Sequence, residues 1–358
     1  MKKNYLTLLL IALAMLQNIN LPAQDSSANP FLKIKPLAFR FQALPLSAIT
    51  PGGWLKTELK RNLDGFTGRL DTLAPDLIQQ DDIYGKDRLS KKVKNKNLGA
   101  VSDAGEWQAQ FLWWNSETQS NWLDGFIRTA ILLKDKTQLE KAERLINRLL
   151  QTQDKDGYIG IYDPELRYRF DNENGELWSK ATLYRALLGW YDYKKDPALL
   201  TAIEKAVKNV MDNYPVNQSH PFYSVNPDAG GLTHGLAFTD VLEQLYVLTK
   251  KQAYLDYCLF LYKDFSTQTL NEDAQFKKLQ QADLPLKGHG VHTYEHLRSV
   301  IAAWYASGNP ALKPAIDQFI RKINRATTPS GAPVGDEFAG GRAGDATSTG
   351  YEFCSLHE

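Results

Sequence analysis

Pairs of helical stretches joined by very short turns are the feature that most restricts how this chain can fold. Apolar residues spaced three or four apart predict three such pairs, joined by turns such as Lys195-Asp196-Pro197 and Gly308-Asn309-Pro310. The pairs cover residues 177–193 with 197–213, 236–249 with 252–267, and 291–306 with 310–326. Two-helix units of roughly 40 to 55 residues, with no strand-like alternation between them, indicate a helical solenoid or a closed toroid.

The first part of the chain shows the same helical patterning. A helix is predicted to begin near Trp54, and the segment Trp122 to Phe126 is predicted to open a second helix that runs to about Lys134. Residues 137–153 form an amphipathic stretch that ends at the two-glycine turn Asp156-Gly157-Tyr158-Ile159-Gly160. The chain is therefore predicted to be helical through most of its length.

Composition sets the broad class of protein. The 358 residues are 43% hydrophobic and 11% aromatic, which is enough for a substantial core. The formal charge of +1 falls to about −1 without Lys2 and Lys3, and both signs are interspersed, so neither nucleic acid nor an anionic membrane is expected as a partner.

Residues 1–23 resemble a bacterial export signal. Lys2 and Lys3 precede an apolar run from Tyr5 to Leu16, and Ala23 supplies a small residue at the expected cleavage point. The apolar run is too short for a membrane span, so a periplasmic or secreted protein is expected. Residues 24–52 are then an extended N-terminal segment, and residues 53–358 form the folded domain.

The last stretch of the chain carries the residues best suited to chemistry. It contains Asp336-Glu337-Phe338 in a glycine-rich setting, then Gly350-Tyr351-Glu352-Phe353-Cys354. Glycines let a backbone approach a ligand, a carboxylate can donate or take a proton, and Glu352 and Cys354 are one hard and one soft metal ligand. Acidic glycine loops are also common as solvated turns, and a lone cysteine is common as a small buried residue.

This pattern resembles the catalytic segment of the glycoside hydrolase family 127 group, the β-L-arabinofuranosidase-like proteins. The resemblance implies an all-α fold closed into an (α/α)6 toroid, and the family's C-terminal β-sandwich is absent from this chain. It implies that Glu337 is the acid/base residue, with Asp336 as the alternative, and that Glu352 and Cys354 bind zinc. The family's zinc site is completed by two adjacent cysteines further on, one of them the nucleophile, and this chain stops at Glu358 before any such pair. We expect either a frame cut short or a natural form that has lost catalysis.

Two His-Gly turns precede predicted helices. His234 lies in Gly230-Gly231-Leu232-Thr233-His234-Gly235, while His289 and His292 lie in Gly288-His289-Gly290-Val291-His292. Such histidines are commonly turn residues, but the family uses similar segments to hold sugar hydroxyls, so the resemblance makes His234, His289 and His292 substrate-binding candidates. His296 follows His292 by four residues and is expected to be a partly exposed helix residue rather than half of a metal pair.

Further candidates follow from the same resemblance. Glu176 and Trp178 lie in Gly175-Glu176-Leu177-Trp178, which is similar to a family His-Glu-Leu-Tyr motif with Gly175 in place of the histidine. Aromatic faces cover the apolar face of a sugar ring, although about half of the tryptophans in such a stretch are expected to be core residues. Those tryptophans are Trp107, Trp113, Trp114 and Trp122. Cys258 lies in a buried-helix pattern and is expected to be a core thiol.

The resemblance implies a retaining glycoside hydrolase that removes β-L-arabinofuranosyl or a related sugar from plant-type oligosaccharides or polysaccharides. In the family, a zinc-held thiolate attacks the anomeric carbon while the acid/base glutamate assists the leaving group. Two rivals stay open. One is another (α/α)6 carbohydrate enzyme, such as an unsaturated glucuronyl hydrolase or a lyase, and the other is a non-catalytic glycan-binding toroid.

Overall fold

Helices make up the folded part of the chain in the computed structural model, which describes residues 29–90, 113–169, 174–333, 338–339 and 354. Within those residues the β-structure is limited to isolated bridges, so the all-α toroid expected from the resemblance is the fold. The helices are α2 (Gly53–Asp64), α3 (Phe66–Leu73), α5 (Trp114–Leu133), α6 (Lys136–Gln151), α7 (Glu176–Lys194), α8 (Pro197–Asn213), α9 (Gly230–His234), α10 (Phe238–Thr249), α11 (Gln252–Thr267), α12 (Phe276–Leu279), α13 (Gly290–Ser307) and α14 (Leu312–Arg325), with short helical turns η1 (Leu46–Ala48), η2 (Asp76–Gln80) and η3 (Gly235–Ala237).

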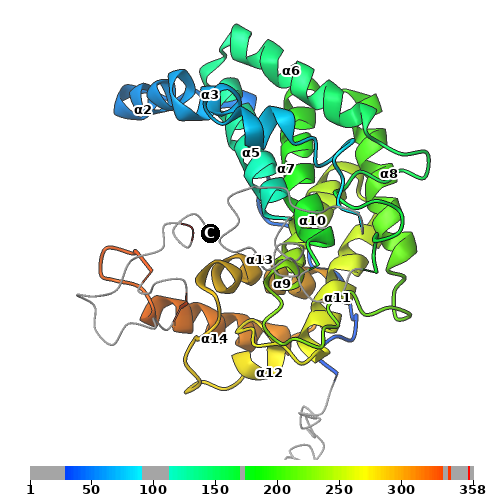
Figure 1. Ribbon diagram of the computed structural model, residues 1–358. Coiled ribbons are helices and arrows are strands. Elements are labelled where there is room, and N and C mark those ends of the chain that lie inside the picture. Colours follow the sequence, from blue (N-terminus) through cyan, green and yellow to red (C-terminus); the bar gives the residue numbers. More distant parts are fainter. Residues whose placement is uncertain (1–28, 91–112, 170–173, 334–337, 340–353, 355–358) are drawn as a thin grey trace, which may run out of the picture.

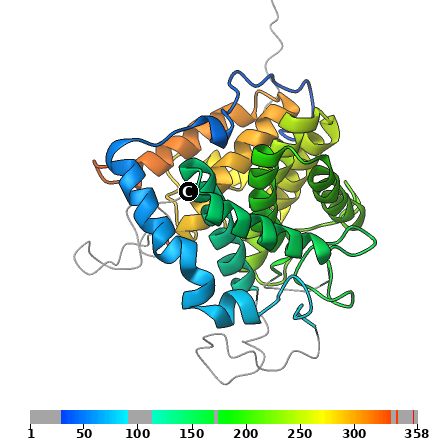
Figure 2. The same cartoon turned by 90° about the horizontal axis from the view of Figure 1, so that it is seen from above.

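The helices follow one another around the toroid in chain order (Figures 1 and 2). Contacts between α5 and α7, between α7 and α10, and between α10 and α13 link successive hairpins, and each of these helices packs on its own partner, α6, α8, α11 or α14. Helices α7 and α13 are buried on nearly all sides, whereas α6 and α14 keep a solvent-facing stripe. The most buried helices therefore carry residues at the centre of the fold.

The predicted helical pairs are confirmed with small shifts in their bounds, and one predicted start is wrong. The first helix of the second hairpin unit, α5, begins at Trp114 and not near Trp122. Its first two turns are mostly polar, and two of their side chains bond an earlier part of the chain: Asn115 donates to the Leu77 carbonyl, and Gln119 donates to the Leu77 and Asp81 carbonyls. Apolar spacing cannot reveal such a start, because tertiary hydrogen bonds hold it in place.

The predicted helix near Trp54 is confirmed as α2, but its apolar residues differ in burial. Trp54 is 78% exposed and Leu55 is 46% exposed, whereas Leu63 is fully buried. No helix among the described residues is both long and apolar enough to cross a bilayer. The leader at residues 1–23, on which the export prediction rests, lies outside the described residues.

The extended segment that begins at Asn29 is bound to the end of α13. The backbone amides of Ile34 and Lys35 donate to the Ser307 carbonyl at 2.8 and 3.0 Å, and Leu37 donates to the Tyr305 carbonyl at 2.8 Å. These bonds join parts of the chain that are about 270 residues apart in sequence. The N-terminal segment is therefore hydrogen-bonded to α13 in the last hairpin.

Candidate functional site

Three histidines from the two His-Gly turns meet at one place in the fold. His234 ends α9, His289 immediately precedes α13, and His292 lies in the first turn of α13. The ring centroids of His234 and His292 are 3.9 Å apart, those of His289 and His292 are 4.5 Å apart, and those of His234 and His289 are 5.9 Å apart. We call these three residues the histidine cluster. The structure thus brings together the two turns that the sequence singled out.

Glycines let the turn that carries His234 pack closely. A Cβ atom added at Gly231 would lie 2.8 Å from the Trp113 ring, and one added at Gly235 would lie 2.7 Å from Cβ of Leu177 on α7. Any side chain at these two positions would force α9 or η3 away from its neighbours. The glycines beside His234 are therefore explained by close approach to Trp113 and to α7.

A buried carboxylate holds the turn that carries His289. Asp273 Oδ2 accepts hydrogen bonds from the backbone amides of Lys287 at 2.9 Å and Gly288 at 2.7 Å, and from the Thr293 hydroxyl at 3.1 Å. Burial raises the pKa of Asp273, although these hydrogen bonds act to lower it. Asp273 thus ties the turn before α13 to the Thr293 side chain in the first turn of the helix and fixes where His289 lies.

Trp178 forms one side of the histidine cluster. Its ring stacks on His234 with centroids 4.5 Å apart and planes 18° apart, and its Nε1 donates to Oε2 of Glu117 at 3.1 Å. Trp113 meets His234 edge-on at 6.2 Å. Trp178 is 2% exposed and Trp113 is 4% exposed, so both are buried side chains that pack against His234. The role of Trp178 as a sugar contact stays a prediction.

The remaining tryptophans differ in their surroundings. Trp122 stacks on Phe126 with centroids 5.5 Å apart and donates to the Thr67 carbonyl, which makes it a wall residue between α3 and α5. Trp114 is 48% exposed. Trp107 lies outside the described residues.

A second layer of buried polar side chains lies behind the histidine cluster. Oε1 of Glu295 lies 2.9 Å from Nδ1 of His234, and Oε1 of Glu272 lies 2.9 Å from Nδ1 of His292. Nε2 of His296 lies 3.0 Å from the Thr233 carbonyl. His296 is fully buried, so the expectation of a partly exposed residue is wrong: α13 is an inner helix whose first two turns have no solvent-facing side.

Burial sets the protonation states in this region. It is the main reason why the pKa of His234 lies well below its usual value, why that of His289 is lowered to about 4 and why that of His296 is lowered to about 3. Burial alone would raise the pKa of Glu272, but His292 and His296 outweigh it and lower that pKa to about 2. At neutral pH, His234, His289 and His296 are therefore uncharged, and Glu272 is ionised.

Sequence reasoning missed Glu272 and Glu295. Glu295 is three residues after His292, a spacing that places the two on neighbouring positions of one helix, but its partner is His234 from another segment. Glu272 lies in the acidic run Asn271-Glu272-Asp273, which reads as a solvated loop. The sequence signal was weak for both glutamates, because a contact with another part of the chain determines where each carboxylate lies.

The described residues of the C-terminal segment lie at the same site. Phe338 forms an antiparallel bridge with His289, its ring lies 6.0 Å from the His289 ring, and the Ala339 amide donates to the Gly288 carbonyl at 2.9 Å. Glu337 directly precedes Phe338 in the sequence but lies outside the described residues, as does Glu352. The residue that follows the predicted acid/base glutamate is thus bonded to the histidine cluster.

The two cysteines have different surroundings. Cys354 is exposed, and it is not joined to Cys258 in a disulfide. Cys258 is fully buried on α11, and burial raises the pKa of its thiol well above the usual value. The prediction of a core thiol at position 258 is confirmed.

Glu176 takes part in a buried ion pair. Its Oε1 is in contact with Nζ of Lys180 one turn later on α7, and its Oε2 accepts the Tyr168 amide at 3.0 Å. Lys180 is fully buried, and its Nζ lies 3.8 Å from the centre of the Tyr158 ring. The substrate-binding role of Glu176 stays a prediction, while its contacts here hold the start of α7.

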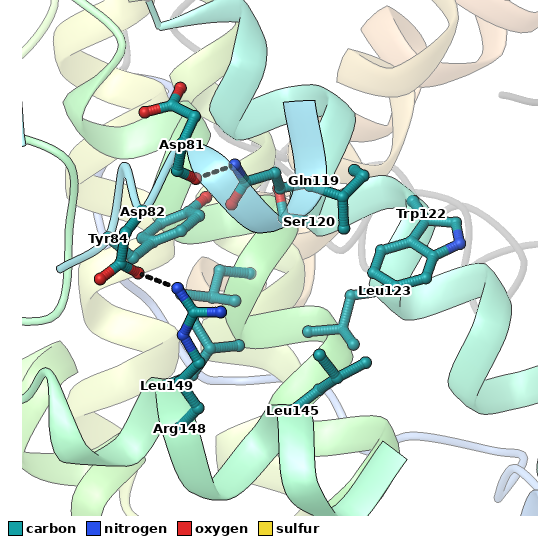
Figure 3. A pocket seen from close by; sticks show the side chains of 12 residues that line it. Asp81, Asp82, Tyr84, Gln119, Ser120, Trp122, Leu123, Leu145, Arg148 and Leu149 are labelled. Atoms are coloured by element: carbon teal, nitrogen blue, oxygen red, sulfur yellow. Dashed lines mark hydrogen bonds and ion pairs between the residues drawn. The ribbon is translucent and has the colours of Figure 1, made fainter. Parts of the chain in front are cut away.

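A small cavity between α5 and α6 lies apart from the histidine cluster (Figure 3). Its walls include Asp82, which pairs with Arg148 at 3.1 Å, and Gln119, which donates to the Asp81 carbonyl. Its volume of about 50 Å³ is far below the ~300 Å³ or more of most ligand pockets and is comparable to the space of one or two waters. We assign this cavity no role in binding a sugar.

Three ligand atoms of the histidine cluster lie within 4.8 Å of one another, so the cluster could hold a metal ion. Imidazole nitrogens suit zinc, copper, iron and nickel, and carboxylates that bond the second ring nitrogen are usual behind metal-bound histidines. The same arrangement also suits hydrogen bonds with hydroxyl groups.

Comparison with protein families gives a match over more than half of the chain. The family model described as "Beta-L-arabinofuranosidase, GH127 catalytic domain" matches residues 81–283. That range contains His234 and Trp178 and stops before His289. A comparison with curated proteins gave no match.

Solved structures share the fold. A GH127 β-L-arabinofuranosidase from Geobacillus stearothermophilus T6 superposes with a TM-score of 0.60 at 15% sequence identity, over 81% of this chain and 47% of that one. The GH127 β-arabinofuranosidase BT3674 superposes with a TM-score of 0.55 at 14% identity, over 84% of this chain and 44% of that one. This chain therefore spans about half the length of these two structures.

Proposed function

This chain belongs to glycoside hydrolase family 127, and on that premise we propose that it contributes to retaining hydrolysis of β-L-arabinofuranosides or of a closely related sugar in plant-type glycans. The observation that carries the proposal is the meeting of three segments at one place. His234, His289 and the residue that follows Glu337 come from distant parts of the chain, and they lie together at the histidine cluster.

The side chains of the site have complementary tasks in this proposal. The histidine cluster holds sugar hydroxyls, because an uncharged imidazole, as at His234 and His289, can both donate and accept hydrogen bonds. Glu337 protonates the glycosidic oxygen in the first step and takes a proton from water in the second. The bridge between Phe338 and His289 supports this assignment, since it ties the neighbour of Glu337 to the sugar-binding residues.

Zinc is the metal that the family resemblance implies, with Glu352 and Cys354 as ligands. A structural or catalytic zinc site needs at least three protein ligands. Among the described residues this ligand set is represented by Cys354, an exposed thiol, which does not make a zinc site by itself. We therefore base no catalytic step on the metal.

The proposal includes export to the periplasm or the medium. It is supported by the sequence of residues 1–23, in which two lysines precede a short apolar run and a small residue.

Activity on aryl β-L-arabinofuranosides tests the proposal. Glu337→Gln should lower turnover by ~10² to 10⁴ on an aryl glycoside with a poor leaving group, and by much less on one with a good leaving group, because general acid assistance matters most when the leaving group is basic. Cys354→Ala tests the predicted metal ligand in the same assay.

His220→Gln is a control variant in the same assay. The His220 side chain is 73% exposed and pairs with Asp264 away from the cluster, so its replacement should leave turnover unchanged. If Glu337→Gln hydrolysed the aryl glycoside with the poor leaving group as fast as the wild type does, Glu337 would not be the acid/base residue.

A further inference from the structure

A second and larger cavity lies between the loop that follows α6 and the last residue of α8. Its volume of about 350 Å³ falls within the ~300 to 1,000 Å³ of most ligand pockets. We call it the outer cavity. It is lined by Asp156, Pro164, Arg167, Tyr168, Arg169 and Asn213, none of which the sequence singled out as a site residue.

The first turn of α7 connects the outer cavity with the histidine cluster. The Tyr168 amide donates to Oε2 of Glu176 at 3.0 Å, and the Trp178 ring stacks on His234. Residues two positions apart in an α-helix point in nearly opposite directions, because 3.6 residues complete a turn. The outer cavity and the histidine cluster therefore lie at the same end of α7, on two different sides of the helix.

Tyr168 has a strained backbone in the middle of this lining. Its φ of 58° lies in the left-handed region, which is unusual for a bulky residue. Its hydroxyl donates to Oδ1 of Asn209 at 2.7 Å, and this bond, together with the one to Glu176, holds the strained turn in place. The turn brings Arg167 and Arg169, the two neighbours of Tyr168, to one cavity. Strained residues that the surrounding structure holds in this way are concentrated at ligand sites.

The two arginines differ in how they are held. The guanidinium of Arg167 contacts Asp154, and its Nη1 lies 3.7 Å from Oδ2 of Asp156. Arg169 is exposed and forms no ion pair with another described residue. The Asp156 side chain is 57% exposed, so its carboxylate is also open to a ligand. The outer cavity thus offers one fixed and one mobile guanidinium beside an accessible carboxylate.

This mixture of groups determines the class of ligand. Arg167 and Arg169 only donate hydrogen bonds, Asp156 only accepts them, and the Asn213 amide does both. A sugar hydroxyl donates and accepts at once, so neighbouring hydroxyls match a lining of this kind. A carboxylate or a phosphate would instead meet the like charge of Asp156, and the charges of the two arginines are already balanced by Asp154 and Asp156.

We propose that the outer cavity is a second glycan-binding site, which holds a neutral sugar unit of the glycan other than the one bound at the histidine cluster. The inference rests on the proposed function in one respect, namely that the substrate is a glycan. It adds a site for the rest of the glycan at the end of the toroid that carries the cluster.

Electrophoresis of the full chain in native gels that contain a polysaccharide tests this site. Wild type should be retarded by neutral arabinan more than by polygalacturonate. Arg169→Ala should weaken binding to arabinan about 2- to 10-fold, which corresponds to the loss of one hydrogen bond. Asn213→Ala is the second variant and should act in the same direction, and both side chains are exposed, so neither change should disturb folding.

Two results in these gels would overturn the proposal. One is equal retardation of the wild type and both variants by arabinan. The other is retardation by polygalacturonate alone, because the outer cavity would then be an anion site.

Arg69→Ala is the matched control for loss of an exposed arginine. Arg69 lies on α3, outside the outer cavity, so this variant should bind arabinan as the wild type does. Equally weakened binding in Arg69→Ala and Arg169→Ala would overturn the proposal, since it would show that the polysaccharide responds to surface charge in general.

Kinetics on a substrate with a single sugar unit separate the outer cavity from catalysis. An aryl β-L-arabinofuranoside has no further sugar to place there, so Arg169→Ala should keep the wild-type kcat/KM. A large loss of kcat on this substrate would place Arg169 at the reacting sugar and overturn the proposal.

The inference and the proposed function can fail separately. Retardation by arabinan that Arg169→Ala weakens, with no hydrolysis of aryl arabinofuranosides, would support the outer cavity and reject the catalytic proposal. Hydrolysis that depends on Glu337, with equal retardation of wild type and variants, would support the catalytic proposal and reject the outer cavity.

Discussion

Lys180 is a fully buried cation paired with a buried anion. Its ammonium contacts Glu176 and lies over the Tyr158 ring. Breaking a buried pair by removing one partner leaves the other charge unpaired in a low-dielectric interior. Lys180→Met should therefore lower the free energy of unfolding by ~3 to 5 kcal/mol in urea denaturation.

Two variants control this prediction. Lys208→Met removes a lysine with the same four-residue spacing to its partner Asp212, but its side chain is 72% exposed, so the loss should stay below ~0.5 kcal/mol. Glu176→Gln combined with Lys180→Met should cost much less than the two single changes summed. Additive losses would show that the two side chains do not depend on each other.

The pH dependence of stability also follows from Lys180. Burial, opposed by Glu176, lowers the pKa of Lys180 from 10.5 to about 8. Between pH 8 and 10 the unfolded chain keeps a proton that the folded protein releases, so the unfolded state binds more protons and stability rises with pH, by at most ~1.4 kcal/mol per pH unit. The pKa of Tyr158 is raised, which has the opposite effect above pH 10.

The measurement is urea denaturation at several pH values from 7.5 to about 9.5, with Lys180→Met beside the wild type. The difference in unfolding free energy between the two proteins should grow with pH. A difference that stays constant across this range would mean that Lys180 keeps its proton in the folded protein.

At the scale of elements, the close contact of η3 with α7 makes a specific prediction. A Cβ atom at Gly235 would lie 2.7 Å from Leu177 Cβ, so Gly235→Ala should cost ~1 to 3 kcal/mol of stability and loosen the stack of His234 on Trp178. Gly125→Ala is the control, because nothing lies within 4 Å of a Cβ there and alanine favours the interior of α5 by ~0.5 to 1 kcal/mol. Thermal unfolding should move in opposite directions, and equal shifts would contradict the packing argument.

The elements also show how far the sequence was informative. The hairpins α7 with α8, α10 with α11, and α13 with α14 were predictable because proline, asparagine or lysine turns separate clear apolar patterns. The start of α5 was not, because its polar side chains are satisfied by the Leu77 and Asp81 carbonyls from an earlier turn of the chain.

The residues of the candidate site also differ in whether the sequence could reveal them. His234, His289 and His292 could be found because the His-Gly turn occurs twice and resembles a family pattern. Glu272 and Glu295 could not, since nothing local distinguishes them from surface acids, and the contacts that bury them join residues 20 and 61 positions apart.

At the scale of the whole molecule, the N-terminal segment contacts two successive hairpins of the toroid. Phe39 stacks on Tyr305 of α13 with centroids 5.0 Å apart and planes 11° apart, and it also contacts Tyr246 at the end of α10. The segment therefore joins two successive hairpins through one side chain. Contacts between distant parts of a chain stabilise the final fold but form late, because a long loop must close first.

Phe39→Ala should therefore lower the melting temperature, with a loss of ~1 to 3 kcal/mol because the side chain is only half-buried. Phe41→Ala is the matched control two residues later, since Phe41 is 92% exposed and its removal should cost almost nothing. In kinetic experiments Phe39→Ala should speed unfolding more than it slows folding, because its contacts join ends that meet late. Equal melting temperatures for the two variants would mean that the hairpins of α10 and α13 hold together without the Phe39 side chain.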